Sequence, residues 1–274
     1  MEILLFRATL APSLVLLVSV AARRLGPRAG GQLLGAPTTT GPFLALMCMT
    51  SGTGAAAQAT HGSATGQLAV SVFTLAYGRL APHLRPTLTL LSTLGCAAVA
   101  GVVGAWCPSI WLTAALVLAV ILAGLMTWPA AEPAAQPEQL ARAREILLRM
   151  LLAGATMLAA MAVSVRVGSF VGGVLSSLPV LLAVIGPSLH RSAGPTAAAT
   201  MMRGALAGAS GTMAFLLVLS TTLVPQGPRA AFLLALAAMI LPASMLRWLR
   251  PVRPSPDTSA PPPLPLSAER TPPQ

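Results

Sequence analysis

Long apolar runs alternate with short polar or basic stretches along this chain, a pattern typical of polytopic membrane proteins. The hydrocarbon core of a bilayer is about 30 Å thick, so a spanning helix needs about 20 apolar residues. Nine runs meet this requirement, and the pattern therefore predicts about nine transmembrane helices. The nine runs cover residues 3–22, 29–49, 54–78, 87–106, 109–128, 146–165, 167–189, 195–224 and 228–248.

Two of these runs carry prolines that should interrupt a helix. The second run contains Pro37 and Pro42, and the seventh contains Pro179 and Pro187, each among several glycines. Proline lacks a backbone N–H and clashes with the preceding turn, so it kinks or ends a helix. We therefore expect both runs to be kinked or broken.

The two halves of the chain align without a gap when the sequence is shifted by 142 positions. Chance matches among Ala and Leu are expected in apolar sequence, but agreement of many glycines, two arginines and a proline in one register indicates an internal duplication. The matched pairs include Arg7 with Arg149, Arg24 with Arg166, Gly30 with Gly172, Gly31 with Gly173, Pro37 with Pro179, Gly52 with Gly194, Gly62 with Gly204, Gly66 with Gly208 and Phe73 with Phe215.

The duplication also predicts a topology, because four helices match four helices and one helix between them is unpaired. The second copy must then enter the membrane from the opposite side, as in the inverted repeats of many secondary transporters. The expected fold is an all-α polytopic membrane protein with two inverted four-helix repeats joined by one linking helix. Its expected domains are a first repeat at 1–108, a linking helix at 109–128, a cytoplasmic linker at 129–145, a second repeat at 146–249 and a Pro-rich, disordered cytoplasmic tail at 250–274.

Arginine positions predict the orientation, because cytoplasmic loops of membrane proteins are enriched in basic residues. In the nine-helix arrangement most loop arginines fall on one side, and Arg166 and Arg229 fall on the other. We therefore expect an inner-membrane protein with a periplasmic N-terminus and a cytoplasmic C-terminus. The arginines expected on the cytoplasmic side are Arg23, Arg24, Arg28, Arg79, Arg85, Arg142, Arg144, Arg191, Arg250 and Arg253.

Composition excludes an ordinary soluble domain. Apolar residues make up 55% of the chain and charged residues 8%, whereas soluble domains carry about 25% charged residues. The net charge of +11 could suggest nucleic acid, but the arginines are scattered between apolar runs and form no basic stripe. Lipid is the expected partner, nucleic acid is not, and the sequence leaves open whether the chain forms a homo-oligomer.

Two pairs of basic side chains related by the 142-residue shift lie inside the predicted runs. Arg7 corresponds to Arg149, and His61 corresponds to Arg203. A cation inside the bilayer is costly, so a basic site retained in both halves is consistent with an anionic ligand. Alternatively, each side chain extends its head group to the membrane surface, and His61 could be a neutral packing residue.

Polar groups beside the expected helix breaks are a second set of candidates. Backbone groups freed by proline are tolerated at membrane depth mainly where they line a cavity. The neighbouring hydroxyls could bind a substrate, or they could bond the freed carbonyls inside closely packed, kinked helices. These candidates are Thr38, Thr39, Ser176 and Ser177, together with Gln58 on the third predicted helix, where Gln67 adds polarity.

The positions of the acidic residues and the absence of catalytic motifs argue against catalysis and against ion coupling by a carboxylate inside the membrane. All six acidic residues lie outside the predicted runs, and buried carboxylates are the common proton and sodium couplers. The sequence has no phosphate-binding loop, metal-ligand cluster or nucleophile beside a base. We expect no enzyme activity, no metal and no cofactor.

One segment resembles a known family. The stretch from Phe170 to Pro179, followed by Gly194, an Ala-rich turn and Gly204, resembles the small four-helix GlpM-like membrane family. Gly30 to Pro37 has the same glycine-to-proline spacing. The resemblance covers about 90 residues in each half and implies a tandem fusion of a unit that elsewhere exists singly. It implies no catalytic residues and no substrate.

Two functions follow as hypotheses. The first is a secondary transporter or flippase-like permease for a small organic anion or an anionic lipid headgroup, with the site between the broken helices. The second is a non-transporting membrane scaffold or accessory subunit of an envelope-synthesis complex, which predicts a packed interior without a polar cavity.

Overall fold

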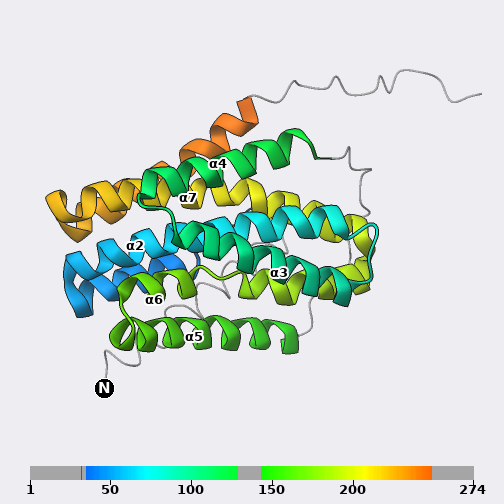
Figure 1. Cartoon of the computed structure of the whole chain (residues 1–274), viewed down its shortest axis with the longest axis horizontal. Helices are drawn as coiled ribbons and strands as arrows, with labels where there is room; N and C mark the ends of the chain where they lie inside the picture. Colours follow the sequence, from blue (N-terminus) through cyan, green and yellow to red (C-terminus); the bar gives the residue numbers. More distant parts are fainter. Residues whose placement is uncertain (1–31, 33–34, 129–142, 249–274) are drawn as a thin grey trace, which may run out of the picture.

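A computed structural model describes residues 32, 35–128 and 143–248, except for the side chains of 143–146, 149 and 241–248. The described elements are all helices (Figure 1). The predicted N-terminal helix, most of the predicted linker and the Pro-rich tail lie outside the described residues. The helices are α2 (Thr40–Leu80), α3 (Pro86–Ala105), α4 (Ile110–Met126), α5 (Ala143–Arg166), α6 (Ser169–Ser176) and α7 (Val180–Trp248).

Local chemistry explains several helix ends. Pro86 occupies the first turn of α3, where its missing N–H costs nothing. The Ser109 hydroxyl caps α4 by accepting a hydrogen bond from the Leu112 N–H at 3.3 Å. At the other end of α4, the Arg79 guanidinium of α2 donates to the Thr127 carbonyl at 2.7 Å. Arg79 thereby satisfies a free carbonyl at a helix C-terminus and joins α2 to α4.

The two longest helices, α2 and α7, change direction at glycines. Gly52 has φ 84° and ψ 172°, and Gly194 has φ 86° and ψ 172°. Only glycine adopts this conformation without strain. The two positions are 142 residues apart, so the shift seen in the sequence relates two identical backbone conformations. A second break in α7 occurs at Gly227.

Helix α2 lies at the centre of the bundle, beside α7 and between α3 and α6 (Figure 1). Close contact between these helices depends on glycines that leave no room for a side chain. A Cβ atom at Gly66 would lie 2.8 Å from the Val174 carbonyl oxygen. A Cβ at Gly208 would overlap the carbonyl oxygen of Gln32. The two contacts are related by the 142-residue shift, because Gly66 corresponds to Gly208 and Gln32 corresponds to Val174.

The outer surface of the bundle is strongly apolar. Leu91 and Val99 of α3, Trp111 of α4 and Leu151 of α5 each expose more than half of their side chains. Conversely, many hydroxyls are buried. Large exposed apolar surfaces mark contact with membrane or protein. Among the described residues, two helices are long and apolar enough to cross a membrane, Pro86–Ala105 and Ser169–Ile240, which supports association with a membrane.

The prediction of about nine transmembrane helices in two inverted four-helix repeats is wrong. Besides the two candidate spans, Ile110–Met126 and Met150–Arg166 are apolar but shorter. Helix α7 covers the last part of the seventh run and the eighth and ninth runs, with breaks at Gly194 and Gly227 between them. In the third run, α2 buries several Thr, Ser, Gly and Gln residues at positions where a spanning helix usually carries apolar residues.

Candidate functional site

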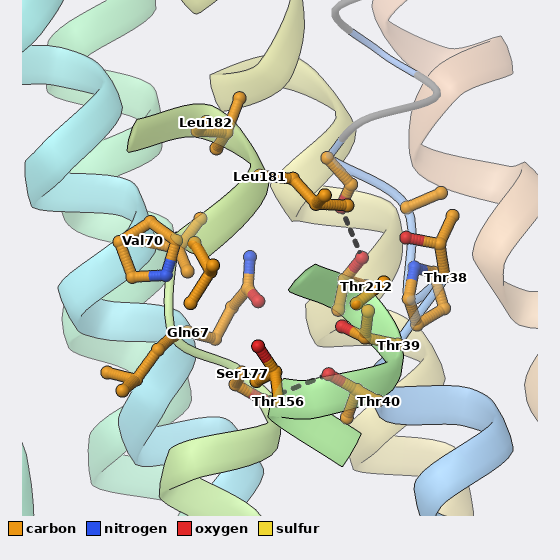
Figure 2. Close-up of a pocket in the computed structure, with 17 residues that line it drawn as sticks. Thr38, Thr39, Thr40, Gln67, Val70, Thr156, Ser177, Leu181, Leu182 and Thr212 are labelled. Atoms are coloured by element: carbon orange, nitrogen blue, oxygen red, sulfur yellow. Dashed lines mark hydrogen bonds between the residues drawn. The ribbon is translucent and has the colours of Figure 1, made fainter. Parts of the chain in front are cut away.

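The candidate site is a cavity of about 50 Å³ at the place where two interrupted helices meet (Figure 2). Its walls come from the segment that precedes α2, from the segment that joins α6 to α7, and from a few residues of each of the helices α2, α5 and α7. Most of its described polar groups are hydroxyls. The polar side chains that line it are Thr38, Thr39, Thr40, Gln67, Thr156, Ser177 and Thr212.

The first interruption precedes α2 at Pro37. A tight turn joins the Thr38 N–H to the Ala36 carbonyl at 2.7 Å, and the helical ladder then begins with the bond from Gly41 to Pro37. Pro42 lies in the first turn of α2, where proline is compatible with a helix. The chain therefore reaches the cavity in an irregular conformation and leaves it as a helix.

The second interruption separates α6 from α7 at Pro179. Helix α6 ends at Ser176, and the Ser177 and Leu178 N–H groups close its last turn with three-residue bonds. Helix α7 then begins at Val180. Pro187, the other proline expected to interrupt this run, lies within a helical stretch of α7. The break occurs at Pro179 because this residue cannot extend the α6 ladder.

Hydroxyl groups join the two interruptions to each other. The Thr39 and Thr40 hydroxyls both donate to the Ser176 carbonyl, at 3.1 and 3.3 Å. The Thr40 and Ser177 hydroxyls bond each other at 3.0 Å (Figure 2). On the other side of the cavity, the Thr212 hydroxyl of α7 donates to the Gly35 carbonyl at 2.6 Å (Figure 2). These bonds hold the cavity walls together.

The wall segments are related by the same shift of 142 positions. Residues 35–40 and 177–182 both line the cavity along their whole length, and 35 + 142 gives 177 while 40 + 142 gives 182. Val70 and Thr212, which also line it, are another such pair. The cavity thus lies where corresponding parts of the two halves of the chain face each other.

Gln67 is the buried polar group of this site that lacks a partner. Its side chain extends from α2 into the space near Ser177 and Thr212 (Figure 2). Only 4% of Gln67 is exposed, and its Nε2 atom has no hydrogen-bond partner. A buried donor without a partner costs about 1–3 kcal/mol. A water molecule or a ligand in the cavity would satisfy this donor.

The predicted site residues divide into those on the cavity and those away from it. Thr38, Thr39 and Ser177 line the cavity, and Ser176 borders it through its bonds to Thr39 and Ser63. Gln58 is exposed on α2. His61 packs edge-on against Phe170, with its ring centroid 5.6 Å from that of Phe170.

The three predicted arginines have different outcomes. Arg203 lies on α7 and does not line the cavity. Arg149 lies on α5 with its side chain outside the described residues, and Arg7 lies entirely outside them. The structure therefore places no described arginine on the cavity wall.

Four polar wall residues were not predicted as site residues: Thr40, Gln67, Thr156 and Thr212. Thr40 could have been included as the third member of the Thr38–Thr40 run. Gln67 is the second glutamine of the same helix, nine residues beyond the one chosen. Thr212 is less accessible to sequence reasoning, because its counterpart in the first half is the apolar Val70.

The cavity wall, as far as the structure describes it, is polar but neutral. Among the described residues that line the cavity, none is charged, and no cluster of metal-ligating side chains occurs in the described part of the chain. Comparison of the chain with family models, with curated proteins and with solved structures found no match. The resemblance to the GlpM-like family therefore stays a prediction.

Proposed function

We propose that this chain is a multi-pass inner-membrane permease that carries a small organic anion or an anionic lipid headgroup through the cavity between its broken helices. The observation that carries the proposal is a polar cavity at the meeting point of two interrupted helices, inside a bundle whose exterior is apolar. Membrane transporters place substrate sites at such interruptions, where irregular backbone can face a cavity.

The correspondence between the halves of the chain supports the same proposal. Equal backbone conformations at Gly52 and Gly194, and cavity walls formed by residues 35–40 and 177–182, favour an internal duplication with the site between the copies. The scaffold hypothesis predicts an interior without a polar cavity, so the cavity favours the permease.

Uptake into proteoliposomes tests the proposal. Purified protein should accelerate uptake of radiolabelled short-chain carboxylates or flip a labelled anionic lipid, relative to liposomes without protein. Ser177→Ala should slow transport roughly two- to tenfold, because one hydrogen bond contributes about 0.5–1.5 kcal/mol. Ser192→Ala is the matched control, since Ser192 is exposed and far along α7 from the cavity wall. A correctly folded protein that transports neither class of substrate would contradict the proposal.

The proposed orientation places the C-terminus in the cytoplasm, as the arginine distribution favours. A fluorescent protein fused after Gln274 should therefore fluoresce, whereas alkaline phosphatase at the same position should be inactive. The reciprocal result, an active phosphatase and a dark fluorescent protein, would reverse the orientation. A fusion within the exposed turn at Pro82 provides a second position for the same assay.

A further inference from the structure

One side-chain hydrogen-bond donor of the described cavity wall lacks a partner. Three buried side-chain atoms in the described residues lack a partner: His61 Nε2, Gln67 Nε2 and Arg79 Nε. Of these residues, only Gln67 lines the cavity. Its amide nitrogen carries two hydrogens and can only donate.

Most carbonyl groups around the cavity, by contrast, already have donors, with those of Thr38 and Ser177 as the exceptions. Thr39 and Thr40 satisfy the carbonyl at the end of α6, and Thr212 satisfies the one before α2. Turn and first-turn N–H groups satisfy the others. The carbonyls that accept a hydrogen bond belong to Gly35, Ala36, Pro37, Thr39, Leu175, Ser176, Leu178 and Pro179. The unpartnered donor of Gln67 therefore favours a ligand that accepts a hydrogen bond.

Two helix N-termini reinforce this preference. Thr40 begins α2 and Val180 begins α7, and both line the cavity. The helix dipole places partial positive charge at a helix N-terminus. The Gly41 and Val180 N–H groups already bond the Pro37 and Leu178 carbonyls and Pro42 has no N–H, so the other N–H groups of each first turn are the ones that can donate to a ligand. The opposing C-terminus, that of α6, has its Ser176 carbonyl covered by the Thr39 and Thr40 hydroxyls. No described wall residue carries a negative charge that would repel an anion.

The volume limits what can bind. A cavity of about 50 Å³ holds roughly three to five water-sized groups, because one water needs about 10–15 Å³. Formate, nitrate and the carboxylate end of a short acid have this size. A phospholipid headgroup with its glycerol does not.

We infer that the cavity binds one small anion, a carboxylate or an inorganic ion of similar size, which accepts a hydrogen bond from Gln67 Nε2 between the first turns of α2 and α7. A small anion would be the substrate of the proposed permease, and only this role as a substrate rests on the proposed function. Binding itself needs no transport. The anion is held by neutral donors, since the wall residues that the structure describes include no arginine or lysine.

The test is thermal unfolding of the full chain in a non-ionic detergent, titrated with sodium formate, sodium nitrate or sodium chloride against sodium gluconate at equal ionic strength. Formate or nitrate should raise the midpoint of unfolding of the wild type. Gln67→Leu should unfold at a higher temperature than the wild type without anion, because it removes an unpartnered buried amide. Its apparent Kd for formate should rise at least about tenfold, as expected for loss of a hydrogen bond to a charged group.

Gln58→Leu is the matched control, because Gln58 is an exposed glutamine of the same helix; it should keep the wild-type anion response. An equal response in the Gln67 and Gln58 variants would overturn the inference. Protection by a soluble short-chain phosphatidate without protection by formate would also overturn it, in favour of a lipid headgroup. Binding of formate together with absent transport in proteoliposomes would leave the inference standing and contradict the permease.

Discussion

Gly173→Ala is expected to destabilise the fold by about 1–3 kcal/mol or more, the range seen for overpacking in a close-packed interior. A Cβ atom at Gly173 would overlap the Ala59 carbonyl oxygen and lie 2.9 Å from the Ser63 nitrogen. Both obstacles are backbone atoms of α2, so no side-chain rotation can relieve the overlap. The helices α2 and α6 would have to separate, and with them the hydroxyl bonds that join the two interruptions.

The measurement is thermal unfolding in detergent, followed by circular dichroism at 222 nm and by gel filtration. Gly54→Ala is the matched control, because a Cβ at this exposed helical position meets nothing within 4 Å. Alanine is a better helix former than glycine by about 1 kcal/mol, so this variant should be as stable as the wild type or slightly more stable. Equal unfolding of the two variants would show that α2 and α6 are not packed as closely as described.

Thr212→Val is expected to cost about 1–3 kcal/mol of stability and to slow transport at least about tenfold. The Thr212 hydroxyl, 2% exposed, holds the Gly35 carbonyl at the entrance to α2. Valine has nearly the same shape but no donor, so the buried carbonyl loses this bond, and an unsatisfied buried acceptor is expensive. The wall opposite Gln67 should also loosen, which adds the transport defect.

Uptake of a labelled short-chain carboxylate and thermal unfolding should be measured on the same preparations. The control is Thr222→Val, ten residues further along α7, where the hydroxyl bonds the Val218 carbonyl of its own helix at 2.7 Å. That carbonyl belongs to the helical ladder, so the variant should change stability by less than about 0.5 kcal/mol. Wild-type uptake and stability in the Thr212 variant would remove this bond from the mechanism.

Sequence reasoning located the helix interruptions well, because proline acts on its own backbone. Pro37 and Pro179 need no knowledge of distant residues to end a helical ladder, and the hydroxyls beside them could be singled out with them. The same is true of the glycines at positions 52 and 194. Their common backbone conformation is consistent with one local signal repeated in both halves.

Sequence reasoning failed where the answer depends on contacts between distant segments. The break expected at Pro187 is absent, because α7 continues through this residue and breaks at Gly194 and Gly227 instead. His61 and Arg203 were predicted as a pair of basic site residues related by the 142-residue shift. The pair of that shift on the cavity wall is instead Val70 and Thr212. A neutral residue in an apolar helix gives no warning that its hydroxyl satisfies a carbonyl 177 positions away.

The exchanged contacts, Gly66 with Val174 and Gly208 with Gln32, have a consequence for biosynthesis. Each interrupted segment rests on a helix encoded in the opposite half of the message. During translation, the surface of α2 around Gly66 therefore stays uncovered until α6 emerges from the ribosome. A nascent chain that stalls before Ser169 lacks the 177–182 wall of the cavity, so the cavity can form only late in synthesis.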